Sequence, residues 1–165
     1  MTQKTKGNIA DNGTIEIKSS STYENNLPRN LVDFDKSNFF QSLNDKTIVC
    51  FDLKDKLFQL TDYSIKSHNR GSYSRYHLKD WAVEVSLDGE TWEVVDDHKN
   101  DSSLNGPNIS ASFSTKKTNS FYRYVRIRQT GPPWNKSNML YLTTSRLAIS
   151  NLEILGKLKM QTKYK

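Results

Sequence analysis

The sequence has almost no cysteine and no long apolar run. Cys50 is the one cysteine among 165 residues, so the chain can form neither an intrachain disulfide nor a cysteine-based zinc site. No apolar stretch reaches the roughly 18–20 residues that a membrane-spanning helix needs. Residues 1–7 contain no apolar segment like that of a signal peptide. These absences disfavour a transmembrane or signal-directed secreted protein, and we expect a reducing, cytoplasmic location.

Charge of one sign is not concentrated in the body of the chain. Lys and Arg number 24 and Asp and Glu number 18, which gives a formal net charge of +6. Part of this excess lies at the two ends, where we expect a flexible segment at 1–13 and a basic tail at 157–165. The nearly balanced body disfavours a nucleic-acid-binding surface.

Sequence motifs of catalysis are also missing. The chain contains no Gly-x-Ser-x-Gly elbow, no P-loop and no His-Glu-x-x-His motif. Its histidines, His68, His77 and His98, share no metal-binding spacing. We therefore expect a protein that is not an enzyme.

What the chain does contain is a series of short segments in which apolar and polar residues alternate. Apart from one helical turn near Leu31, no segment shows the 3.6-residue period of a helix. Strands are predicted at 14–18, 47–53, 60–67, 81–86, 91–95, 121–129, 140–149 and 152–155, with the ordered pattern ending at Gly156. Cys50, within the second of these, is expected to be a small core residue. Seven or eight short strands separated by turn signals indicate an all-β, antiparallel β-sandwich or barrel.

The clearest local signal is a hairpin. Residues 81–86 and 91–95 flank Asp88-Gly89, a pair that favours a two-residue type I′ turn. In the later strand 121–129, Val125 and Ile127 are expected to face the core. Arg126 and Arg128 are expected on the outer face in cross-strand pairs, and Arg123 is expected to reach a sheet edge or a buried carboxylate. The predicted core contains Trp81, Trp92, Phe51, Tyr63, Phe121 and Ile127.

Four segments of this sequence resemble the discoidin domains, the C-type domains of coagulation factors V and VIII. The hairpin W-x-V-E-x-S-x-D-G-x-x-W at 81–92 is similar to their central hairpin, and Y-R-Y-V-R-I at 122–127 to one of their strands. L-E-I-L-G at 152–156 resembles their closing strand, and the aspartate and aromatic residues of 32–42 an early segment. The resemblance covers 14–156 and implies one galactose-binding-like jelly roll, a β-sandwich that serves as a binding module.

The resemblance also implies that ligands bind to loops at one end of the sandwich. Carried onto this chain, these loops are 21–26, 43–46 and 68–77, joined by the Gly-Pro-Pro-Trp-Asn loop. Tyrosine stacks on sugar faces and apolar groups, and arginine recognises carboxylates and phosphates. The expected ligand is a protein partner; a glycan is the open alternative. The candidate ligand-binding residues are Tyr23, His68, Asn69, Arg70, Tyr73, Arg75, Tyr76, His77, Trp134 and Asn135.

A structural calcium ion is the one cofactor that the resemblance suggests. In sugar-binding relatives, oxygen ligands surround such an ion at positions that correspond to Asp33, Asp35, Ser37 and Glu153. Calcium binds six to eight oxygen atoms, mostly from carboxylates and carbonyls. The alternative is a turn in which Asp33 and Asp35 accept backbone N–H groups and Glu153 lies elsewhere.

Overall fold

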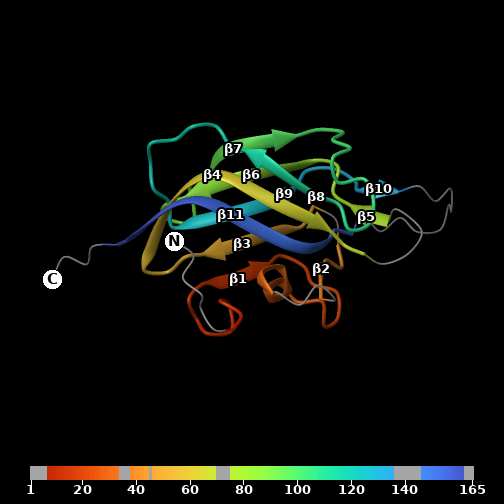
Figure 1. Cartoon of the computed structure of the whole chain (residues 1–165), viewed down its shortest axis with the longest axis horizontal. Coiled ribbons are helices and arrows are strands. Elements are labelled where there is room, and N and C mark those ends of the chain that lie inside the picture. The colour runs from red at the N-terminus through yellow and green to blue at the C-terminus, as the bar shows by residue number, and fades with distance from the viewer. Residues whose placement is uncertain (1–6, 34–37, 45, 70–74, 136–145, 162–165) are drawn as a thin grey trace.

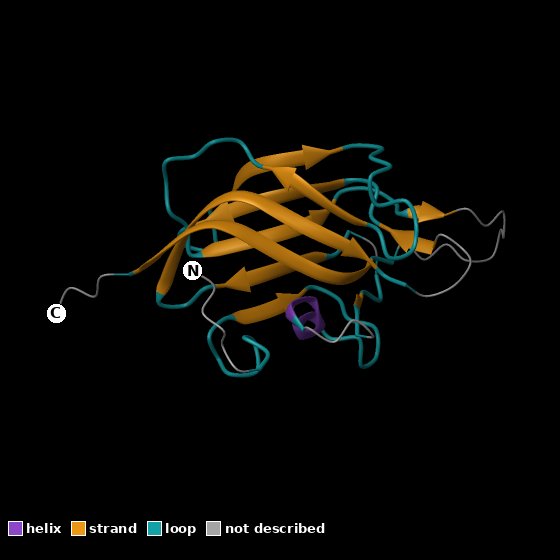
Figure 2. Ribbon diagram, in the orientation of Figure 1, coloured by secondary structure: helices purple, strands orange, loops and turns teal. Residues whose placement is uncertain are grey.

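The chain folds into two antiparallel β-sheets packed face to face (Figures 1 and 2). This computed structural model describes residues 7–33, 38–44, 46–69, 75–135 and 146–161. The five-stranded sheet has the order β1-β3-β9-β6-β7, with β1 (Glu16–Ser19), β3 (Ile48–Asp52), β6 (Trp81–Ser86), β7 (Glu93–His98) and β9 (Tyr124–Gln129). The four-stranded sheet has the order β2-β11-β4-β8, with β2 (Phe40–Gln41), β4 (Lys56–Ser67), β8 (Ser110–Ser114) and β11 (Ala148–Met160). The predicted all-β, antiparallel sandwich is confirmed.

Two smaller elements complete the described fold. A two-stranded sheet of β5 (Arg75–His77) and β10 (Trp134–Asn135) lies at one end of the sandwich (Figure 1). One 3-10 helix, η1 (Pro28–Val32), lies beside β11 and matches the helical turn predicted near Leu31. None of the helices in the described ranges has the length and apolar character to cross a membrane.

The core lies between the two sheets, where apolar side chains from both inner faces meet. Val125 and Ile127 alternate inward on β9, as predicted, while the residues between them are half-buried. All six residues of β6, which lies between β9 and β7, are buried. The largest fully buried side chains include Trp81, Tyr63, Phe40, Phe51, Leu31, Leu60, Ile65 and Ile127.

Three of the predicted core residues lie outside the core. Trp92 is half-buried and lies just before β7, where Arg126 stacks over its ring with the guanidinium carbon 3.7 Å from the centroid. Phe121 is half-buried before β9, and Lys159 Nζ lies 4.1 Å from its ring centroid. The predictions for Trp92 and Phe121 were wrong because each residue precedes its strand. The alternation of inward and outward side chains along a strand therefore does not apply to them. Cys50 lies in β3 but alternates outward, and burial raises the pKa of its thiol to about 11.

The hairpin is confirmed, but its turn differs from the prediction. β6 pairs with β7 up to Val85 and Glu93, so the connecting loop is longer than the two residues of a type I′ turn. Gly89 has a positive φ of 83°, whereas Asp88 is not among the residues with positive φ. Asp88 instead organises the loop through Oδ1, which accepts the N–H groups of Glu90 and Thr91 at 2.8 Å each.

The closing strand is longer than the sequence pattern indicated. β11 passes through Gly156 and continues to Met160, paired with the first half of β4. Gly156 does not end the strand; it lies where a Cβ atom would be 2.0 Å from the Gln59 carbonyl oxygen. The residue is glycine because the neighbouring backbone leaves no room for a side chain. The predicted strand 140–149 is seen only from Ala148, and 140–145 lie outside the described residues.

Candidate functional site

The predicted first and second loops are joined at the end of the sandwich near β2. The Ser21 hydroxyl accepts the backbone N–H groups of Leu43 and Asn44 at 2.9 and 2.8 Å. The backbone N–H of Tyr23 donates to the Gln41 carbonyl at 2.8 Å, which ties the first loop to β2. These bonds fix the backbone that carries Tyr23 and make this part of the loop end rigid.

Tyr23 and Arg146 form the pair of side chains at this end that is best suited to bind a ligand. Both are half-buried, and the Arg146 guanidinium carbon lies 4.3 Å from the centroid of the Tyr23 ring. Arg146 Nε is buried and has no hydrogen-bond partner among the described residues. Sequence reasoning missed Arg146 because it lay inside a predicted strand, whereas it precedes β11. The pair places an aromatic ring beside a guanidinium whose Nε–H has no partner among the described residues.

Trp134 forms a second aromatic position on β10. Its Nε1–H donates to the Asp101 carbonyl at 2.8 Å, and Lys79 Nζ lies 4.9 Å from its ring centroid. The half-buried indole therefore folds back onto the 99–106 loop instead of standing freely in solvent. Asn135 lies beside it in β10, opposite Arg75 of β5.

The histidines of the third predicted loop lie beneath the surface. His68 and His77 are 3% and 1% exposed, and their ring centroids lie 4.9 Å apart. Phe39 packs against His68 with centroids 5.9 Å apart. The two buried imidazoles pack beneath the loop end. Direct contact between them and a ligand stays an untested prediction. Of the other predicted ligand-binding residues, Asn69 is exposed, Tyr76 is half-buried, and Arg70 and Tyr73 lie outside the described residues.

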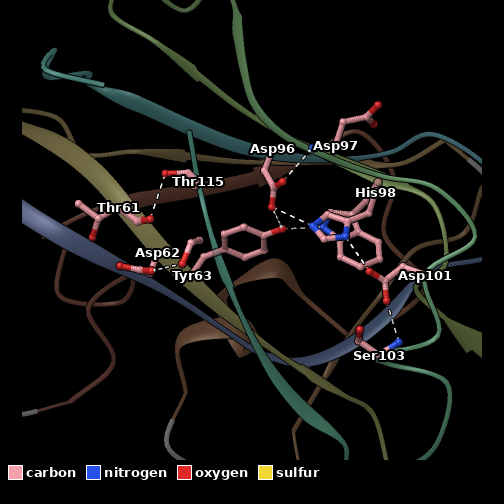
Figure 3. A network of polar contacts seen from close by, with 11 residues as sticks. Thr61, Asp62, Tyr63, Asp96, Asp97, His98, Asp101, Ser103 and Thr115 are labelled. Carbon is pink, nitrogen blue, oxygen red and sulfur yellow. Dashed lines mark hydrogen bonds and ion pairs between the residues drawn. The ribbon is translucent and has the colours of Figure 1, made fainter. Parts of the chain in front are cut away.

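A polar network runs from the buried side chain of Tyr63 through Asp96 and His98 to Asp101 (Figure 3). His98 Nδ1 lies 2.7 Å from Asp101 Oδ2, and His98 Nε2 lies 2.8 Å from Asp96 Oδ2. The Tyr63 hydroxyl donates to Asp96 at 2.7 Å and accepts the indole N–H of Trp81 at 2.9 Å. The buried groups of this network, the Tyr63 hydroxyl and the Trp81 indole N–H, are thereby paired, as buried polar groups must be.

Asp101 is the point where this network meets the loop end. Its Oδ1 accepts the backbone N–H of Ser103 at 2.7 Å, and its carbonyl accepts the Trp134 indole N–H. Burial alone would raise the pKa of Asp101, but hydrogen bonds from Ser103 and His98 outweigh it and hold that pKa below its usual range. For Tyr63, burial outweighs the bond from Trp81 and raises its pKa. Sequence reasoning considered His98 only as a metal ligand and missed this network.

The outer face of the five-stranded sheet carries a charge cluster, defined by Glu84, Arg126 and Arg128. Glu84 has a side chain that is 4% exposed, and it accepts from Arg126 Nε at 2.5 Å and Arg128 Nη2 at 2.6 Å. Burial opposes ionisation of Glu84, but the two arginines outweigh it and lower its pKa. Arg123 forms a two-pronged ion pair with Asp52 at 2.8 Å for both bonds. The cross-strand pairs and the carboxylate partner of Arg123 are therefore confirmed.

Only part of the predicted calcium set can be placed. Asp35 and Ser37 lie outside the described residues. Asp33 directly follows η1 and accepts from Asn38 Nδ2 at 3.2 Å, while Glu153 is exposed on β11 opposite Ser64. Within the described ranges no group of three or more His, Cys, Asp or Glu residues is arranged to hold a metal. Calcium binding therefore stays a prediction.

Comparison with known proteins gives one family match and many similar folds. The model of the F5/8 type C domain family matches residues 16–143. In Drosophila melanogaster, the E3 ubiquitin-protein ligase Ufd4 is 34% identical over 100 residues, which cover 59% of this chain and 3% of that protein. The chain thus matches only a small part of the length of this relative.

Two solved structures from Clostridium perfringens have the same fold. CpGH89CBM32-5, in complex with GalNAc-beta-1,3-galactose, has a TM-score of 0.65 and 10% identity, covering 87% of this chain and 96% of that one. The family 32 CBM of NanJ, in complex with galactose, has a TM-score of 0.63 and 8% identity, covering 88% and 94%. At these identities the likeness concerns the fold.

Proposed function

The chain belongs to the F5/8 type C domain family, and we propose that it is a non-catalytic recognition module that binds a carbohydrate at its loop end. Two observations support this proposal. Proteins with the same fold are in complex with galactose and with GalNAc-beta-1,3-galactose. In this chain, the loop end carries half-buried aromatic rings beside cationic side chains.

The pair of Tyr23 and Arg146 is the observation that carries the proposal. A sugar ring presents an apolar C–H face, which packs on aromatic side chains, and hydroxyl groups, which need hydrogen-bond donors and acceptors. Tyr23 supplies the aromatic ring, and Arg146 supplies a donor at Nε that no described residue uses. The guanidinium is held against the tyrosine, so little side-chain entropy is lost when it binds.

Isothermal titration with galactose, N-acetylgalactosamine and GalNAc-beta-1,3-galactose tests this function. We expect at least one of these sugars to bind with a Kd on the order of 1 mM, the range of about −4 kcal/mol. Arg146→Ala and Tyr23→Ala should each weaken binding about tenfold, because each removes one half of the pair. Leu87→Ala is the matched control, since Leu87 is 57% exposed in the β6–β7 loop. Absence of binding by all three sugars at tens of millimolar contradicts the proposal.

Recruitment of a protein partner in the cytoplasm is the second candidate. It is favoured by the 34% identity to a segment of an E3 ubiquitin-protein ligase. In this case the same loop end would bind a protein and bring it to a ubiquitin-ligase-like assembly. Affinity capture from a cytosolic extract, compared between the natural chain and Arg146→Ala, distinguishes the two. A partner that is lost in the variant and not displaced by the sugars supports recruitment; a partner displaced by free sugar supports the carbohydrate function.

A further inference from the structure

In the part of the chain that the structure describes, strand β11 has one edge without a strand partner over most of its length. On one side β11 pairs with β4 from Ile149 to Met160, but on the other side β2 pairs only with Ala148 and Ile149. Among the described residues, no other strand or backbone group hydrogen-bonds to the free edge between Glu153 and Met160. Figure 1 shows this half of β11 reaching the end of the sandwich where the C-terminus lies, away from β5 and β10.

The free half of β11 is exposed and carries three apolar side chains. Residues 155–160 are all exposed, and Leu155, Leu158 and Met160 have exposed fractions of 46%, 57% and 61%. An exposed strand edge with apolar side chains is a template for pairing with another strand. Lys157 and Lys159 oppose pairing with an arbitrary strand, so a suitable partner must place an acidic residue opposite one of them.

Strand β11 of a second copy of the chain supplies this acidic residue, Glu153. In two antiparallel strands related by a two-fold axis, directly opposed residues lie on the same face of the sheet. With the axis at Gly156, Glu153 lies opposite Lys159 of the second copy, and Ile154 lies opposite Leu158. The symmetry forms each of these pairs twice, and the two glycines at the axis bring no side chains together. We propose that β11 pairs with β11 of a second copy and joins the two four-stranded sheets into one continuous sheet.

Two features select the axis at Gly156 over its neighbours. An axis at Lys157 would place two lysines opposite each other, which is unfavourable. An axis at Leu155 would place Glu153 opposite Lys157 and shift the paired segment toward Asn151. The side chain of Asn151 already donates to the Leu31 carbonyl of η1 at 3.1 Å. With the axis at Gly156, the paired segment runs from Glu153 to Lys159 and does not reach Asn151.

Charge exchange in the 165-residue chain tests the pairing, with association measured by sedimentation equilibrium between about 10 and 500 µM. We expect the natural chain to form a dimer within this range, since one strand pair buries a small interface. Glu153→Lys and Lys159→Glu should each weaken association about tenfold, because each opposes like charges at two places. The double variant Glu153→Lys/Lys159→Glu restores opposite charges and should return association to within about threefold of the natural value. Both residues are exposed on β11. Because Lys159→Glu also removes the contact of Lys159 Nζ with the Phe121 ring, circular dichroism checks that each variant is folded.

Lys157→Glu is the matched control, with the same charge change on the same strand. Its residue lies opposite Leu155 in the proposed register, so the dimer should persist. A natural chain that stays monomeric at 500 µM overturns the proposal. Failure of the double variant to restore the dimer overturns it as well, and loss of the dimer in Lys157→Glu rather than in Lys159→Glu overturns the register.

Discussion

The imidazole of His98 stacks on the indole of Trp81, with ring centroids 4.1 Å apart and planes at 8°. Trp81 is fully buried, whereas the His98 side chain keeps 18% of its surface exposed. The histidine therefore covers the edge of the core where β7 ends, and its two carboxylate partners fix its orientation. Through His98, the buried Trp81 is connected to Asp101, and the Asp101 carbonyl in turn accepts the indole N–H of Trp134.

His98→Ala should lower the free energy of unfolding by about 2 kcal/mol, because it removes the ring contact and leaves two carboxylates without their partner. Amide hydrogen exchange should become faster across the 99–106 loop, which Asp101 holds. Chemical denaturation and exchange measured by NMR provide the two readouts. Asp97→Ala is the matched control on the same strand, because its side chain is 50% exposed. Equal stability of the two variants would contradict the role given to His98.

Glu84→Ala should be more destabilising than any exposed acidic substitution on this sheet. It leaves Arg126 and Arg128 without their shared carboxylate, and removing one partner of a buried ion pair typically costs about 3–5 kcal/mol. The arginine side chains are 20% and 36% exposed and can recover water, so we expect a loss of about 2 kcal/mol. Urea denaturation measures the loss. Glu90→Ala, an exposed residue of the same hairpin, should change stability by less than about 0.5 kcal/mol.

Asp88 should titrate at an unusually low pH. Hydrogen bonds from the N–H groups of Thr91 and Glu90 and from Ser86 lower its pKa to about 2. The folded pKa lies below the unfolded value of roughly 3.9, so this contribution to stability is complete above pH 4 and is lost as the pH falls through 2. Carboxyl NMR shifts followed from pH 5 to 1.5 measure the titration. A midpoint above 3.5 would show that the loop does not hold the carboxylate in this way.

Two glycine substitutions should differ although both positions are crowded. Gly156→Ala places a Cβ 2.0 Å from a backbone oxygen, which can move only if β4 and β11 separate. Gly106→Ala meets the end of the Ile109 side chain at 2.6 Å, and that side chain can rotate away. We expect losses of about 3 kcal/mol for the first and about 1 kcal/mol for the second. Thermal unfolding at a concentration of a few micromolar gives the comparison, and the reverse order would contradict the close approach at Gly156.

Local sequence patterns predicted the fold where one face of a strand is apolar and the other polar. The alternation of Val125 and Ile127 with the arginines of β9 is such a case, and the hairpin after Trp81 is another. Where a β-bulge shifts the pairing of two strands, the sequence pattern did not predict which face of the sheet a residue lies on. A bulge between β6 and β7 leaves Val95 as an extra residue, and this change of phase turns Asp96 toward Tyr63.

The candidate site was predicted less completely than the fold. Tyr23 and Trp134 were expected at the loop end from their resemblance to family positions. Arg146 could not be found, because its contact with Tyr23 joins segments far apart in the sequence and depends on where β11 begins. The burial of His68 and His77 was equally hidden, since it results from packing against Phe39 and against each other.

A titration of the isotopically labelled chain with galactose and with N-acetylgalactosamine, followed by amide and side-chain NMR shifts, tests the carbohydrate-binding loop end most directly. We expect saturable shifts at Tyr23, at the Arg146 Nε–H and at the Trp134 indole N–H. Residues of the hairpin loop around Leu87, at the other end of β6, should not shift. Shifts confined to that opposite end, or none at tens of millimolar sugar, would contradict the account.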